Sequence, residues 1–206
     1  MIRYAVLVLA LASVGFHLYL IFSGLIGNLV SRPVHLALAL PWVFLLREGE
    51  HRWQRTLGMV WCAVGLWACG YIVWQRQALS DQYGYLEGPV QFFLAAVLIL
   101  TVLEMARRAI KLALPLVAVI ALAYGMFGQY LPGEFGHPGI PLASLLGNLT
   151  IAEAGIWGPL AGVSVNVVAV FILLGSMVGA GEGGTGFMSL ATRLAGRYRA
   201  GAAKVS

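Results

Sequence analysis

A stretch of 22 residues, from Gly158 to Gly179, carries no charged side chain. As a helix it would be about 33 Å long, which is enough to cross a hydrocarbon core of about 30 Å. The first half of the stretch holds the polar residues Ser164 and Asn166. These side chains either line an ion or substrate path or hydrogen-bond to a neighbouring helix, and helix packing is the favoured role.

The composition extends this conclusion to the whole chain. Hydrophobic residues make up 60% of the sequence and charged residues 10%, whereas a soluble domain has about 25% charged residues. So few charges cannot cover a water-facing surface, so the sequence predicts a polytopic membrane protein. The net charge of +5 comes from short loops between apolar runs. It therefore indicates membrane topology and argues against nucleic acid as a partner.

The predicted fold is an all-α membrane bundle with about six transmembrane helices and no strands. The expected spans are Tyr4–Leu25, Pro33–Leu46, Leu57–Trp74, Pro89–Met105, Ala109–Tyr130 and Gly158–Gly179. The second has 14 residues and would be only about 21 Å long, so the count falls to five if it is re-entrant. Pro115 is expected to kink the fifth span. The stretch from Leu131 to Trp157 is expected to pack on the protein or dip into the membrane.

The basic residues predict the orientation of the chain. With either count of spans, 11 of the 13 Lys and Arg residues fall on one side of the membrane. The positive-inside rule then places the C-terminus in the cytoplasm and the 131–157 stretch outside, but it does not decide whether Pro33–Leu46 spans. The tail from Thr185 to Ala200 has apolar and basic faces, which predicts an amphipathic helix on the cytoplasmic surface.

Small residues recur along one face of the third span. Gly58, Cys62, Gly65 and Cys69 follow one another at steps of four, three and four. Such a stripe allows a second helix to approach closely.

Few residues are candidates for chemistry. His17 and His35 lie on the first two apolar segments and are the basis of a haem-binding alternative, although packed histidines are more common. Glu104 lies three and four residues before Arg107 and Arg108, which favours structural ion pairs over an ion-binding role. His51 and His137 lie in expected loops and are predicted to be solvated.

The sequence has no glycine-rich phosphate loop, no metal-spaced cluster and no catalytic triad, so neither an enzyme nor a resident cofactor is expected.

Several stretches together resemble the fused membrane permease of tripartite ATP-independent periplasmic (TRAP) transporters, of the type whose binding protein is of the TAXI class. These stretches are Arg32–Leu40, Leu103–Leu116, Ala123–Gly133, Gly155–Ser164, Phe171–Ser176 and Leu194–Lys204. Their order and spacing carry the resemblance more than any single motif.

The resemblance implies a secondary transporter of the bacterial inner membrane that imports small organic acids, including dicarboxylates. A sodium or proton gradient would drive it, and a TAXI-type periplasmic binding protein would supply the substrate. Residues 1–84 would correspond to the small-subunit scaffold, and residues 85–206 to the start of the large permease subunit. The Gly-Ser-rich hairpin signature of the family does not occur before Ser206.

We therefore assign no substrate or ion ligand from the family, and expect transport to need the remainder of the permease. Near the fourth of these stretches the family has Glu directly before Gly-Ile, whereas here Ala154 separates Glu153 from Gly155. The alternative function is a structural or haem-binding membrane anchor subunit of a larger complex.

Overall fold

The computed structural model describes residues 2–24, 26–46, 52–110 and 112–195, and every regular element in these ranges is helical. The α-helices are α1 (Ile2–Ser23), α2 (Asn28–Phe44), α3 (Arg52–Trp74), α4 (Arg76–Asp81), α5 (Gly88–Ile110), α6 (Ala113–Phe127), α7 (Leu142–Thr150), α8 (Pro159–Val163), α9 (Ala169–Ala180) and α10 (Gly183–Ala195). Three short 3₁₀ turns are η1 (Gly128–Tyr130), η2 (Gly133–Phe135) and η3 (Gly155–Trp157), and η4 (Ser164–Val168) is a π-helical turn. The prediction of an all-α fold is confirmed.

Five helical stretches of the described chain are long and apolar enough to cross a membrane. They are Arg3–Ser23, Trp53–Trp74, Gly88–Ile110, Ala113–Tyr130 and Leu142–Ala180. The helix α2, with 17 residues, is not among them, so the number of candidate spans in the described residues equals the smaller of the two predicted counts. The helix α2 begins at Asn28, five residues before the expected start at Pro33, and it contains both Pro33 and Pro41.

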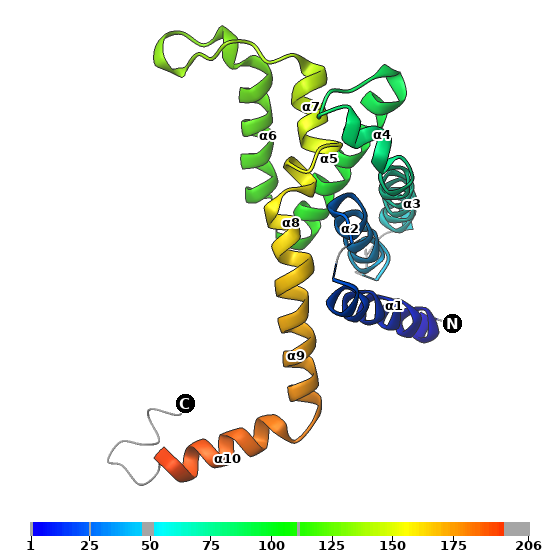
Figure 1. Cartoon of the computed structure of the whole chain (residues 1–206), viewed down its shortest axis with the longest axis vertical. Coiled ribbons are helices and arrows are strands. Elements are labelled where there is room, and N and C mark those ends of the chain that lie inside the picture. Colours follow the sequence, from blue (N-terminus) through cyan, green and yellow to red (C-terminus); the bar gives the residue numbers. More distant parts are fainter. Residues whose placement is uncertain (1, 25, 47–51, 111, 196–206) are drawn as a thin grey trace.

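The buried core lies among α2, α3 and α5, with α6 and α7 packed on α5. Fully buried apolar side chains of this core include Leu40 on α2, Cys69 on α3, and Leu94 and Leu98 on α5. Figure 1 shows α5, α6 and α7 running along the long axis of the molecule, with α8 and α9 continuing below α7. In the same view α1 lies across this direction and contacts α2, η4 and α9.

The small-residue stripe of α3 faces other helices of the same chain. A β-carbon on Gly58 would overlap the carbonyl oxygen of Phe44 on α2. A β-carbon on Gly65 would lie 2.8 Å from Cδ1 of Leu40 on α2 and 3.0 Å from Cγ2 of Thr101 on α5. The stripe therefore allows α2 and α5 to approach α3 closely, as the spacing of its residues predicted.

Pro115 does not kink the fifth span. The helix α6 begins at Ala113, so Pro115 is its third residue, where the backbone nitrogen has no acceptor within the helix. A proline in the first turn costs no hydrogen bond. The expected kink was wrong because the span begins four residues later than Ala109.

The stretch expected to be non-spanning, 131–157, contains the helix α7. It packs against α5 and α6, and the amide of Leu86 donates a hydrogen bond of 3.2 Å to the carbonyl of Ala143. Gly147 lies so close to Gly84 that a β-carbon would overlap the carbonyl oxygen of Gly84. This stretch thus packs on the protein, which is one of the two predicted arrangements.

The amphipathic tail is helical over its described part. The helix α10 begins at Gly183, two residues before the expected start, and ends at Ala195 at the edge of the described residues. It turns away from the line of α9 (Figure 1). The expected continuation of the tail to Ala200 lies outside the described residues, as does His51.

Candidate functional site

Three polar side chains from distant parts of the sequence form one hydrogen-bonded chain where α1, α2 and η4 meet. Nε2 of His17 on α1 lies 2.8 Å from Nδ1 of His35 on α2. Nε2 of His35 lies 3.1 Å from Oγ of Ser164 on η4. His17 is buried, and the two rings meet edge to face with centroids 5.0 Å apart. The structure therefore connects three candidate residues that the sequence could only name separately.

The ring of His17 is hydrogen-bonded to the backbone of its own helix, α1. Nδ1 of His17 lies 2.6 Å from the carbonyl oxygen of Ser13, one helical turn earlier on α1. A carbonyl oxygen only accepts hydrogen bonds, so this nitrogen must carry a proton. The anchor thus fixes the tautomer of His17, because the neutral ring then has only Nε2 as an acceptor.

This geometry does not fit the haem-binding alternative. An iron held by two imidazoles must lie between one nitrogen of each ring. In this structure one nitrogen of each ring faces the other ring, and the remaining two face Ser13 and Ser164. All four ring nitrogens are engaged with protein atoms, so His17 and His35 in this arrangement offer no ligand to a metal.

Ser164 lies at the start of a π-helical turn within an otherwise α-helical segment. The amide of Ala169 bonds to the carbonyl of Ser164, five residues back rather than four. Such a turn widens the helix locally, and π turns occur often at functional sites. Here it buries Val165, while the side chain of Asn166 remains exposed.

A cavity of about 260 Å³ borders this chain of side chains. Its polar lining consists of His17, Asn28, Ser31 and Asn166, and its apolar lining includes Val165. The volume is below the roughly 300–1,000 Å³ of typical small-molecule sites. The cavity is therefore suited to a few water molecules or a small ion, and Asn166 belongs to its wall and not to the hydrogen-bonded chain.

The start of α2 is tied to the interruption between α7 and α8. The Asn28 amide nitrogen donates to a Glu153 carboxylate oxygen at 2.6 Å, and Nη1 of Arg32 donates to the carbonyl oxygen of Trp157. The indole nitrogen of Trp157 in turn donates to the carbonyl of Thr150 at 2.6 Å. These bonds hold α2 beside η3. Sequence patterns gave no signal for them, because each joins residues more than a hundred positions apart or lies in an irregular turn.

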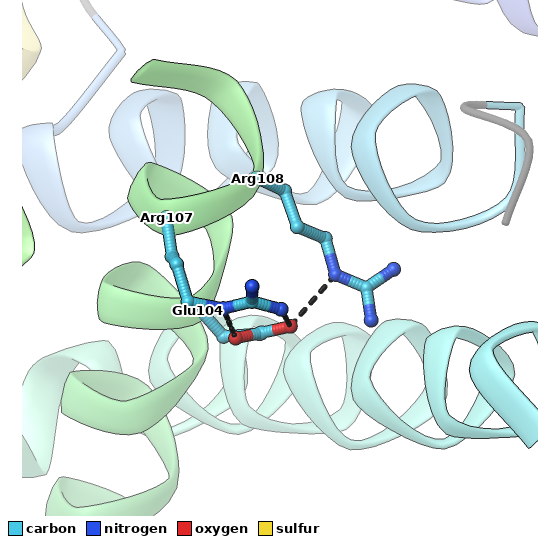
Figure 2. Close-up of polar contacts among 3 residues, drawn as sticks. All are labelled: Glu104, Arg107 and Arg108. Carbon is cyan, nitrogen blue, oxygen red and sulfur yellow. Dashed lines mark hydrogen bonds and ion pairs between the residues drawn. The ribbon is translucent and has the colours of Figure 1, made fainter. Parts of the chain in front are cut away.

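Glu104 forms the ion pairs that the sequence predicted. Its carboxylate accepts hydrogen bonds from Arg107 at 2.7 and 2.8 Å and from Nε of Arg108 at 2.7 Å, as Figure 2 shows. The guanidinium of Arg108 also lies 4.9 Å from the centre of the Phe44 ring on α2. The three charged residues line a second cavity of about 960 Å³ at this end of α2, α3 and α5. Arg108, which Glu104 holds in place, joins the end of α5 to α2.

No group of three or more His, Cys, Asp or Glu side chains that could hold a metal occurs in the part of the chain that the structure describes. What the site does contain is a set of side chains that can carry protons, His17, His35 and Ser164, beside a small polar cavity.

Comparison with known proteins gives one match. Residues 97–206, more than half of the chain, match the family model described as the tripartite ATP-independent periplasmic transporter, DctM component. The match begins within α5 and covers Ser164 and Asn166, while His17 and His35 lie before it. No curated protein and no solved structure matches the chain.

Proposed function

The chain belongs to the DctM family of TRAP transporter components, which are multi-pass membrane permeases and not enzymes, and we propose that it forms part of a permease importing small organic acids. The observation that carries this proposal is the family match over residues 97–206. Five helical stretches of suitable length and composition agree with it. The energy for import would come from a sodium or proton gradient across the inner membrane.

Within this permease, we propose that residues 1–84 act as a scaffold and residues 85–206 begin the transport subunit. The family match starts at residue 97, twelve residues after this boundary. The helices α2 and α3 of the first part pack against α5 of the second. A shared core of this kind would hold the first helices of the transport subunit in place while other parts of the permease move.

The proposed partners are the lipid bilayer, the remainder of the permease and a periplasmic binding protein of the TAXI type. In this arrangement the C-terminus faces the cytoplasm and the 131–157 stretch faces the periplasm. The eleven basic residues on one side of the predicted topology support this orientation. The resemblance of the motifs between Arg32 and Lys204 to TAXI-type fused permeases supports the choice of binding protein.

The choice of binding protein is tested by direct association. The chain, together with the rest of its permease, would be placed in lipid nanodiscs and exposed to purified binding proteins of the TAXI class from the same source. A TRAP binding protein of a different class serves as the matched control. Binding would be followed by surface plasmon resonance, with and without a dicarboxylate.

We expect saturable binding of the TAXI-type protein and none of the control. Binding of the control alone would show a TRAP permease with another partner class. Absence of binding by either protein, in nanodiscs whose permease is folded by circular dichroism, would contradict the tripartite assembly.

A further inference from the structure

The hydrogen bonds among His17, His35 and Ser164 can run in only one direction when both rings are neutral. Nδ1 of His17 donates to the Ser13 carbonyl, so Nε2 of His17 accepts from Nδ1–H of His35. Nε2 of His35 is then also an acceptor, and the Ser164 hydroxyl must donate to it. One backbone carbonyl therefore sets the proton position on both rings and on the serine.

One added proton reverses the last of these bonds. Whether the proton resides on His17 or on His35, only one N–H can lie between the two rings. In both cases Nε2 of His35 carries a proton and donates to Oγ of Ser164. The Ser164 hydroxyl then becomes an acceptor, and its own hydrogen is released to another partner. A second proton would place two N–H groups against each other across the 2.8 Å contact.

We propose that His17, His35 and Ser164 bind a single proton as one unit, and that this proton reverses the hydrogen bond at the π turn. The proton comes from hydronium, which leaves water behind: the Ser164 hydroxyl turns its hydrogen away, Nε2 of His35 accepts the proton, and the positive charge is shared between the rings through their hydrogen bond. The ligand is thus a proton, and the response is a change at Ser164 on η4. This inference does not depend on the substrate or partner proposed above.

The cavity is placed to supply this proton. It is lined by His17 at one end of the chain, and by Val165 and Asn166, which directly follow Ser164 at the other end. The amides of Asn28 and Asn166 and the hydroxyl of Ser31 give water molecules polar partners there. Water molecules in this cavity would lie beside the hydrogen-bonded side chains without entering the apolar core.

The fixed charges near the chain also favour one proton over two. Arg32 lies one turn before His35 on α2, and its guanidinium packs against Gly162, two residues before Ser164. Glu153 lies beside the start of α2, where its carboxylate accepts a hydrogen bond from Asn28. The positive charge of Arg32 opposes any positive charge on the histidine pair, and the first bound proton adds its own charge against a second.

Other titratable groups also lie on the elements packed around the three residues. They are Arg3, Tyr4 and Tyr19 on α1, Arg52, Arg55, Cys62, Cys69 and Tyr71 on α3, and Glu104, Arg107 and Arg108 on α5, while η3, α8, η4 and α9 have none. Glu104 and Arg108 lie near Phe44, nine residues beyond His35 and so about 13 Å away along α2.

The first test measures where the protons are. The full chain, with ¹⁵N-labelled histidine, is studied by NMR in lipid nanodiscs at alkaline and acidic pH, and His51→Gln and His137→Gln remove the other two histidines. At alkaline pH we expect both His17 and His35 to carry their proton on Nδ1, with Nε2 bare. On acidification both rings should change in one step. A neutral His17 protonated on Nε2, or two separate steps, would overturn the proposal.

The second test counts protons. Proton uptake by the full chain over the acidic range is compared with that of the His17→Gln/His35→Gln double variant. We expect a difference of one proton per chain, whereas a difference of two or zero would contradict a shared site. If the double variant does not fold, uptake by the unaltered chain is followed through the two assigned ring signals instead.

Ser164→Ala keeps both rings and removes only the last hydrogen bond. In this variant we expect the Nε2 signal of His35 to shift while the Nδ1–H signal of His17 persists. The matched control is Ser176→Ala on α9. The Ser176 hydroxyl donates to the Leu173 carbonyl at 2.8 Å and takes no part in the hydrogen bonds among His17, His35 and Ser164. Equal shifts in both variants would show that Ser164 does not bond to His35.

Discussion

At the scale of single residues, the surroundings of His137 clearly favour the protonated form of its ring. Nδ1 lies 2.8 Å from the Pro138 carbonyl, and Nε2 lies 3.1 Å from the Tyr124 carbonyl. Two carbonyl acceptors require two N–H donors, which only the protonated ring provides. These bonds raise the pKa of His137 above its usual value of 6.5. The expectation of a merely solvated loop histidine therefore missed its contact with α6.

The connection after α6 should consequently be held most firmly at acidic pH. Because the folded pKa is raised, the stabilisation is fully present below pH 6.5 and is lost as pH rises through the folded pKa. Hydrogen exchange of the backbone amides between Gly128 and His137 should be slower, relative to intrinsic rates, at acidic than at alkaline pH. His137→Gln should abolish this difference. An unchanged pH dependence in the variant would show that another group controls the connection.

The Glu104 carboxylate is expected to be structural. Glu104→Gln removes the charge that Arg107 and Arg108 share. Glu104 and Arg108 are only partly exposed. Since surface ion pairs contribute about 0.2–1 kcal/mol each, we expect a loss of about 1 kcal/mol in stability, seen as a small fall in thermal midpoint. Glu134→Gln, in an exposed turn, is the control and should change nothing. A loss of several kcal/mol in Glu104→Gln would contradict a role limited to these two ion pairs.

At the scale of elements, the packing of α2 on α3 depends on the absence of side chains. A β-carbon on Gly65 would press against Leu40 and Thr101, whereas a β-carbon on Gly70 of the same helix would have no atom within 4 Å. Gly65→Leu should therefore force α2 and α5 away from α3, at a cost of about 1–3 kcal/mol or more. Gly70→Leu should be neutral or slightly stabilising, because Leu has the higher helix propensity. Thermal unfolding in detergent, followed by circular dichroism, measures both.

Equal effects of the two substitutions would mean that helix propensity, and not packing, decides the outcome. Both variants make the same Gly→Leu change within α3, so propensity alone predicts the same shift for each.

The helices also show which structural features can be predicted from sequence patterns alone. Long apolar runs and the Gly58–Cys69 stripe predict helices and a close-packed face, because both depend on local spacing alone. The late start of α6 and the π turn at Ser164 do not follow from spacing, since contacts with other helices determine them. The pairing of His17 with His35 depends on how the chain turns between α1 and α2, and no periodicity encodes that.

At the scale of the whole molecule, the orientation of the chain can be read by labelling. We expect Phe135→Cys, in the exposed turn η2, to react with an impermeant maleimide from the periplasm, and Thr185→Cys on α10 to be protected in intact cells. The native Cys62 and Cys69 are buried, so background labelling should be low. Protection of Phe135→Cys together with labelling of Thr185→Cys would reverse the proposed orientation.

The proposed transport function is tested most directly by measuring substrate uptake. The chain and the rest of its permease would be reconstituted in proteoliposomes, with the TAXI-type binding protein outside and a radiolabelled dicarboxylate. A sodium gradient and a proton gradient are imposed in separate experiments. We expect uptake that requires the binding protein and one of the two gradients. Uptake without the binding protein, or none with either gradient across a panel of small organic acids, would contradict the proposed TRAP permease function.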